Sequence, residues 1–185
     1  MLNMGRFPVM RVKPLIAVPL IAIALAGCST QQPTEETSTA AAQEQPLFSS
    51  DEEALAAAQA AYANYLVVSD QIARDGGANP ERLKGLVSTQ LFEESADVYK
   101  TYKEQSITVE GATSFDSLHI GEISQNSASY YVCLDVGKTK LLNADGIDVT
   151  PVGRQSRLPI IFEVRVTNSS ATIESSEVWS GRNYC

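Results

Sequence analysis

The apolar side chains of this chain change their spacing once, near Gln105, and that change constrains the fold more than any other feature. Before Gln105, apolar residues recur every three to four positions, which is the period of a helix that buries one face. After it, β-branched and aromatic residues alternate with polar ones, as in a half-buried strand. Helices followed by strands predict an α+β domain with a mostly antiparallel sheet, one face of which the helices cover.

Three helical segments are expected before the change. Ser50 and Glu53 have the spacing of a capping box, and a Gly-Gly pair at 76–77 ends the first helix. An Asn-Pro pair at 79–80 begins a second helix, because proline suits the first helical turn. A third helix is expected over residues 89–104.

Five strands are expected after the change, separated by clusters of Gly, Asn, Ser and Asp. NADG at 143–146 and NSSA at 168–171 have the composition of hairpin turns. The expected strands are SITVEG (106–111), SLHIGEI (117–123), ASYYVCLDVG (128–137), LPIIFEVRVT (158–167) and ATIESSEVW (171–179).

The N-terminal residues have the layout of an export signal. A basic opening without acids precedes LIAVPLIAIALAG, a run without charge that ends at Gly27. A membrane-spanning helix needs about 20 apolar residues, so this shorter run suits a signal peptide instead. The residues from Ser29 to Pro46 are mainly Ser, Thr, Gln, Glu, Ala and Pro, a composition that predicts a flexible tether.

LAGC at the end of the apolar run resembles the lipobox of bacterial lipoproteins: an aliphatic residue, two small residues and a cysteine. The resemblance implies that the Cys28 thiol receives a diacylglyceryl group and that a lipoprotein signal peptidase cuts between Gly27 and Cys28. Acylated Cys28 would then hold the chain in the lipid bilayer, on the outer side of the cell membrane. An ordinary secretory cleavage and an uncleaved leader are the alternatives. The expected layout is a signal peptide over 1–27, the lipidated cysteine and tether over 28–49, and the α+β domain over 50–185.

The chain has an odd number of cysteines, which needs an explanation in an exported protein. If lipid occupies Cys28, Cys133 and Cys185 remain as a pair in a compartment that permits disulfides. A bond between them would fix the C-terminal residue, which otherwise frays, and would stabilise the fold by about 4 kcal/mol. Two unpaired thiols are the alternative.

The chain carries a formal net charge of −8, and removal of the basic leader makes the mature chain more acidic still. Such a balance repels phosphate backbones, so we expect no nucleic-acid partner. An acidic surface could attract cationic partners or metal ions. The simpler interpretation is that it keeps an exported protein in solution.

The element order, together with YYVCLDVGKTKLLNADGIDV at 130–149, resembles the cystatin-like, nuclear transport factor two-like superfamily, as found in exported actinobacterial lipoproteins. The resemblance covers about residues 50–185. It implies helices lying in the concave face of a curved sheet, a cystatin-like cone. Many members of this superfamily are binding or accessory modules, whereas the enzymatic ones resemble ketosteroid isomerase and related cyclases.

The enzymatic members place a carboxylate and polar donors inside the cone, which makes His119, Asp116 and Tyr131 the candidate pocket residues, beside Glu122 and Asp135. His119 is the only histidine, the side-chain type best suited to take up or release a proton near neutrality, although it alternates with apolar neighbours and is also explained as an ordinary strand residue. Paired tyrosines on the expected helices either line a pocket or pack in the core. These are Tyr62 and Tyr65, and Tyr99 and Tyr102.

No catalytic, metal-binding or cofactor motif is found in the sequence. One histidine leaves too few ligands for an ordinary zinc site, and phosphate loops, nucleophile elbows and EF-hand spacings are missing. The leading prediction is therefore a membrane-anchored, non-enzymatic lipoprotein that binds an unknown small ligand or protein partner and uses no cofactor. The alternatives are an isomerase or cyclase that uses His119 or Asp116, and an inhibitor or accessory subunit of an envelope complex.

Overall fold

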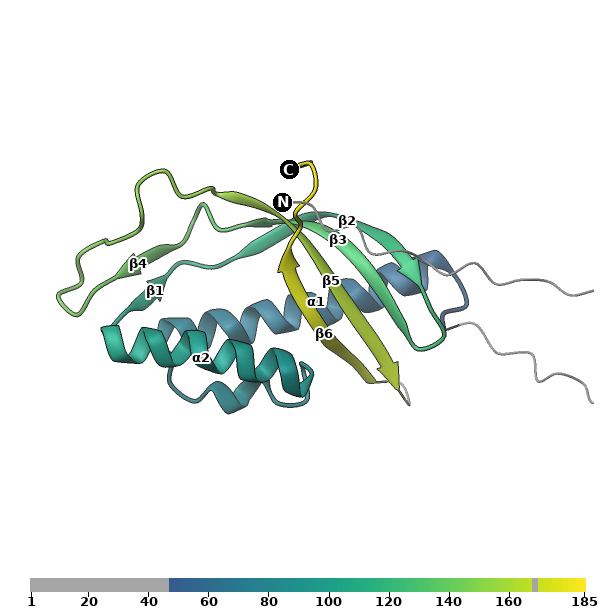
Figure 1. The fold of residues 1–185 in the computed structure, drawn as a ribbon, viewed down its shortest axis with the longest axis horizontal. Coiled ribbons are helices and arrows are strands. Elements are labelled where there is room, and N and C mark those ends of the chain that lie inside the picture. Colours follow the sequence, from purple (N-terminus) through teal and green to yellow (C-terminus); the bar gives the residue numbers. More distant parts are fainter. Residues whose placement is uncertain (1–46, 168–169) are drawn as a thin grey trace, which may run out of the picture. The chain divides into compact units, whose positions relative to one another are not determined.

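The computed structural model describes residues 47–167 and 170–185 (Figure 1). No helix within these ranges is both long and apolar enough to span a bilayer. The predicted signal peptide, the cleavage site after Gly27, the lipidation site Cys28 and most of the tether lie outside the described residues. The described elements are α1 (Asp51–Arg74), the 3-10 helix η1 (Pro80–Leu83), α2 (Thr89–Gln105), β1 (Thr108–Glu110), β2 (Ser114–Ile123), β3 (Ser127–Asp135), β4 (Lys140–Leu142), β5 (Arg157–Thr167) and β6 (Ser170–Val178).

The predicted α+β class is confirmed. Four strands form an open antiparallel sheet in the order β2-β3-β5-β6, and β1 pairs with β4 in a second, two-stranded sheet. Figure 1 shows the larger sheet curving over α1, with α2 beside it below β1 and β4. Helices therefore cover one face of the sheet, here called the inner face, and leave the outer face to the C-terminal segment.

The two α-helices begin where the sequence predicts. The Ser50 hydroxyl accepts a hydrogen bond from the Glu53 amide at 3.2 Å, as an N-cap does. The Glu53 carboxylate accepts from the Ser49 amide at 2.8 Å, one residue earlier than in the usual capping box. Ser88 caps α2 in the same way, with 3.1 Å between its hydroxyl and the Leu91 amide.

The second expected helix is reduced to the four residues of η1. Asn79 has a left-handed backbone, with a φ of 54°, and its side chain makes no capping hydrogen bond. Lys84 already has an extended ψ of 132°, and Gly85 follows with a φ of 84°. The helix therefore ends after one turn, although proline does occupy its first position as predicted.

Gly111 and Gly137 separate the two sheets. β1 precedes β2 and β4 follows β3, so the β1/β4 pair continues the β2/β3 ladder beyond these glycines. A Cβ atom on Gly111, whose φ is 93°, would lie 2.1 Å from the Lys138 carbonyl oxygen. Only glycine permits this approach. We call β1, β4 and residues 143–156 the arm, and Gly111 marks where it begins.

The predicted turn at Asn143 shapes the outer end of the arm. The Asn143 carbonyl accepts from the Gly146 amide at 2.9 Å, and its side chain accepts from the Ile147 amide at 2.9 Å. The chain then returns beside β4, with 2.8 Å between the Val149 amide and the Leu141 carbonyl. β4 itself was not among the predicted strands.

The core lies between α1 and the inner face of the sheet. Ala54 is fully buried and accepts a hydrogen bond from the Tyr130 hydroxyl at 3.1 Å through its carbonyl, so α1 lies close against β3. The Tyr62 ring stacks on the Phe162 ring with 4.2 Å between centroids. The fully buried large side chains are Tyr62, Tyr130, Phe162, Ile72, Leu83, Ile173, Val132, Val164 and Cys133.

The chain between η1 and α2 covers the middle of the free edge of β6. The Ile173 amide donates to the Leu86 carbonyl at 2.9 Å, and the Ser88 amide donates to the Ile173 carbonyl at 2.8 Å. The Ser88 hydroxyl donates to the Glu174 carbonyl at 2.9 Å. These bonds attach the first turn of α2 to the sheet and so fix the helix opposite α1.

Candidate ligand-binding pocket

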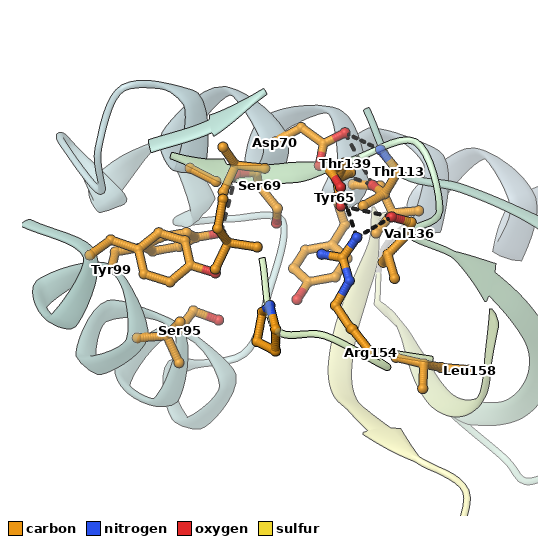
Figure 2. A pocket seen from close by; sticks show the side chains of 17 residues that line it. Tyr65, Ser69, Asp70, Ser95, Tyr99, Thr113, Val136, Thr139, Arg154 and Leu158 are labelled. Carbon is orange, nitrogen blue, oxygen red and sulfur yellow. Dashed lines mark hydrogen bonds between the residues drawn. The ribbon is translucent and has the colours of Figure 1, made fainter. Parts of the chain in front are cut away.

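A pocket of about 490 Å³ lies between α1, α2 and the arm; we call it the helix–arm pocket (Figure 2). Its volume is within the range of small-molecule sites, roughly 300–1,000 Å³. Most of its wall is apolar, supplied by Leu66, Ala73, Val98, Val109, Val136, Leu141, Pro151 and Leu158. Its polar side chains are Tyr65, Ser69, Asp70, Ser95, Tyr99, Tyr102, Thr113, Thr139 and Arg154.

Helical periodicity places the polar groups of α1 and α2 in this pocket. Tyr65 and Ser69 are four residues apart on α1 and therefore lie on the same face. Ser95 and Tyr99 have the same spacing on α2 and face them across the pocket, as Figure 2 shows. Gly77 lets the end of α1 approach α2, because a Cβ atom there would lie 2.1 Å from the Tyr99 carbonyl oxygen.

The phenols of the pocket are neutral hydrogen-bonding groups at ordinary pH. Burial raises the pKa of Tyr65, and the nearby Ser69 and Ser95 side chains offset part of that rise. Burial raises the pKa of Tyr99 to about 12. The Tyr99 hydroxyl donates to the Ser69 carbonyl over 3.4 Å, a long hydrogen bond. Neither tyrosine is therefore suited to act as a base near neutrality.

Arg154 is the cationic group of the wall. Its Nη2 atom donates to the Val136 carbonyl at 2.8 Å and to the Thr139 carbonyl at 2.7 Å, which holds the half-buried guanidinium against the start of the arm. Within the described ranges, no carboxylate lies within 4.0 Å of it. Its charge also acts on Tyr102. Burial raises the pKa of Tyr102, and the charge of Arg154 offsets part of that rise.

Asp70 lies on the same wall, but its carboxylate is already engaged. One oxygen accepts from the Thr113 amide at 2.8 Å, and the other accepts from the Thr113 hydroxyl at 3.0 Å. These bonds tie α1 to the segment that joins β1 to β2. Asp70 therefore has a structural role at the pocket rim and is not a free base.

Asp116, one of the predicted pocket residues, lines a different hollow. This second hollow, of about 460 Å³, lies between α1 and β2 and is bordered by Gln59, Val67 and Phe115 among others. The exposed Asp116 carboxylate pairs with Arg157, whose Nη2 lies 2.7 Å and 2.9 Å from its two oxygens. This hydrogen bonding lowers the pKa of Asp116, so the carboxylate is ionised and paired at neutral pH.

His119 and Tyr131, the other two predicted pocket residues, lie on the outer face of the sheet. They are opposite each other in the β2/β3 register, and their rings stack with 5.1 Å between centroids. Tyr184 and Trp179 pack edge-on against this pair. Tyr131 faces outward because its neighbour Tyr130 belongs to the core on the inner face.

The predicted disulfide is confirmed on the outer face. Cys133 of β3 is bonded to Cys185, with 5.5 Å between their Cα atoms. The tail is held further by the Tyr184 hydroxyl, which donates to the Val132 carbonyl at 3.1 Å and to the Ile160 carbonyl at 3.2 Å. The C-terminal residue is thus fixed to the central strands of the sheet.

The predicted site residues are therefore not brought together in one cavity. His119 stacks with Tyr131 in the open, Asp116 lies beside α1, and Glu122 is exposed on β2. Asp135 lies at the sheet surface, 3.5 Å from Arg157. No group of three or more His, Cys, Asp or Glu side chains is arranged to hold a metal ion in the part of the chain that the structure describes.

The sequence pointed to the pocket only through its tyrosine pairs. Tyr65, Tyr99 and Tyr102 line it, whereas Tyr62 lies in the core beneath the sheet. Arg154 was missed, since it stands in a loop between Gly153 and Gln155 without a motif around it. Only the fold of the arm brings it opposite the helices.

Comparisons with known proteins identify no family. No family model matches the chain, and no curated protein matches it. Among solved structures, the intermembrane space region of the chloroplast protein ARC6 is similar, with a TM-score of 0.51 and 12% identity over 69% of this chain and 97% of that one. A de novo designed β-sheet protein has a TM-score of 0.32 and 14% identity, over 72% of this chain and 97% of that one. The ARC6 likeness supports the α+β fold alone.

Proposed function

We propose that this chain is a lipid-anchored, extracytoplasmic binding protein that takes a small, largely apolar ligand in the helix–arm pocket and performs no reaction on it. The observation that carries this proposal is the pocket wall, where neutral phenols and one guanidinium are set among apolar side chains. Small-molecule sites have this composition, because apolar surface supplies affinity and a few polar groups fix the orientation.

Binding is favoured over catalysis by the state of the titratable groups. A general base has to be within hydrogen-bond reach of its substrate and be able to take up a proton near the working pH. The Asp70 carboxylate is occupied by Thr113, and the raised pKa values of Tyr65 and Tyr99 keep these phenols protonated. The isomerase alternative relied on His119 or Asp116, and both lie outside this pocket.

The membrane anchor rests on the sequence. LAGC, the basic opening and the short apolar run together support acylation at Cys28. Two acyl chains hold a protein stably in a bilayer, whereas a single chain does so only marginally. The tether then joins the membrane surface to a domain that begins near Ser50.

The accessory-subunit alternative is supported by one observation, at the end of the arm. Ile147, Val149 and Val152 are all largely exposed in the loop after β4. Apolar side chains gathered on one loop favour contact with another molecule, although the patch is small. This alternative stays a prediction beside the first.

Filling the pocket is expected to abolish binding without unfolding the domain. Val98 lines the pocket from α2 and is 52% exposed, so Val98→Trp places an indole at the wall without overpacking the core. We expect the affinity for the neutral apolar dye N-phenylnaphthylamine to fall about tenfold or more, because the indole occupies the space the dye needs. The measurement is a fluorescence titration of the mature chain carrying Cys28→Ala, which needs no detergent.

Glu93→Trp is the matched control, because Glu93 is exposed on the same helix and does not line the pocket. It should leave the affinity for the dye unchanged. If Val98→Trp and the parent bind the dye equally, the pocket is not the binding site.

Loss of the anchor is tested separately. In a bacterial host with lipoprotein processing, Cys28→Ala should shift the protein from the membrane fraction to the supernatant or stop its maturation, because the acylated thiol is missing. Ser29→Ala keeps the thiol and should leave the protein with the membranes. Fractionation and mass spectrometry measure both outcomes. If the Cys28→Ala chain stays with the membranes and is cleaved normally, lipidation is refuted.

A further inference from the structure

Three arginines in the described structure form ion pairs, whereas Arg154 forms none. Arg82, Arg157 and Arg165 each form an ion pair with a carboxylate. Arg154 instead bonds only to two backbone carbonyls, through a single nitrogen, and is half-buried at the pocket wall. A guanidinium carries five N–H donors in a planar fork, so Nη1 and Nε keep donors that these two bonds do not use.

A half-buried guanidinium that touches no carboxylate has donors available to a ligand anion. A fork of this kind matches the two oxygens of a carboxylate or of a phosphate, and the resulting bonds are short and charge-assisted. The two carbonyl bonds fix the guanidinium before a ligand arrives, which lowers the entropy cost of binding. This geometry suits an oxyanion.

The charges around Arg154 agree with this role. Asp70, the acidic side chain of the pocket lining, has both oxygens engaged by Thr113. Asp148, farther along the arm, is a carboxylate whose charge acts on Arg154: it makes no ion pair within 4.0 Å, and its pKa is lowered mainly by hydrogen bonds with Thr150, with smaller contributions from the charges of Lys140 and Arg154. The Tyr102 hydroxyl belongs to the same wall and is a further donor toward an anion.

The apolar part of the wall determines the rest of the ligand. Figure 2 shows Tyr65 from α1 and Arg154 from the arm lining the same cavity, with Ser95 and Tyr99 toward its other end. The other side chains of the lining are mainly aliphatic. A molecule that satisfies both regions has one charged end and a hydrocarbon body.

We propose that the ligand of the helix–arm pocket is an anionic amphiphile whose carboxylate or phosphate head pairs with Arg154 while its hydrocarbon chain lies against the apolar wall. This inference rests on the proposed function, since it assigns the ligand class of the same pocket. Fatty acids and alkyl phosphates share this chemistry and are distinguished by the test.

The test compares four probes with the same alkyl chain: dodecanoate, dodecyl phosphate, dodecanol and dodecylammonium. Each displaces N-phenylnaphthylamine from the mature chain carrying Cys28→Ala, below its micellar concentration. At least one anion should bind roughly 10- to 100-fold more tightly than dodecanol, the range of a charge-assisted hydrogen bond, and dodecylammonium should bind more weakly than dodecanol. Whichever anion binds more tightly identifies the head group.

Arg154→Gln should remove this preference. The affinity for the anion should fall roughly 10- to 100-fold, whereas dodecanol and the dye should keep their affinities within about twofold. Arg157→Gln is the matched control, because it removes the same charge from another half-buried arginine, one that does not line the pocket. It should change none of the four affinities.

The possible failures are distinguishable. If the dye and all four probes fail to bind, the proposed function fails and the inference fails with it. If dodecanol binds as tightly as both anions, the pocket still binds ligands but the pairing with Arg154 is wrong. An equal loss for dodecanol and the anion in Arg154→Gln, or an equal loss in Arg157→Gln, also overturns the pairing, since a deformed pocket or a change in net charge then explains the result.

Discussion

Replacing Cys133 and Cys185 together by alanine should lower the free energy of unfolding by about 4 kcal/mol. The two residues are 52 positions apart, so their bond removes much of the conformational freedom of the unfolded chain. It also fixes the tail that carries Tyr184, whose hydroxyl bonds to the Val132 and Ile160 carbonyls. Urea unfolding of the mature Cys28→Ala chain, followed by circular dichroism, measures the loss.

Two controls belong to this experiment. The Cys28→Ala chain treated with reductant should lose about as much stability as the double variant, because the same bond is missing. Denatured without reductant, the Cys28→Ala chain should take up no thiol label. A double variant within about 1 kcal/mol of the parent, or labelling of both Cys133 and Cys185, would show that the bond does not stabilise the folded chain.

Phe162→Ala should lower the free energy of unfolding by about 3–5 kcal/mol. Phe162 lies fully buried on β5, with its ring stacked against Tyr62 at 4.2 Å and against Tyr130 at 5.4 Å between centroids. Truncation leaves a cavity where α1 meets the sheet, and the two tyrosines lose their shared partner. Chemical denaturation with equal m-values for variant and parent gives the difference directly.

Val178→Ala provides the comparison for this prediction. Val178 is on the neighbouring strand β6 and 59% exposed, so its truncation should change stability by no more than about 0.5 kcal/mol. If Phe162→Ala costs as little as Val178→Ala, then α1 does not pack against the sheet in the way described.

Local signals made the helix starts and most strands predictable. Ser50 and Ser88 cap their helices through their own hydroxyls, a pattern that depends on residues three positions apart. The length of η1 was overestimated because its end depends on the backbone of Lys84 and Gly85, which the Asn-Pro signal does not reveal. β4 was missed because its pairing with β1 is a contact between distant segments.

The candidate site was harder to predict, because it depends on which face each strand turns to the helices. Tyr130 and Tyr131 are both aromatic, so alternation along β3 does not tell which of them enters the core. The register then carries His119 outward with Tyr131, away from the pocket. Arg154 reaches the pocket through the kink at Gly111 and the return of the arm, and no short motif encodes that path.

The segment from Leu86 to Ser88 has a consequence for association between copies of the chain. By bonding to Ile173 and Glu174 it covers the middle of the β6 edge, and β2 is the other edge of the four-stranded sheet. β2 has two register shifts against β3, and Ser117 within it has a φ of 58°. A second strand would meet an irregular row of donors and acceptors there, so both edges disfavour the strand-by-strand growth that leads to intermolecular sheets.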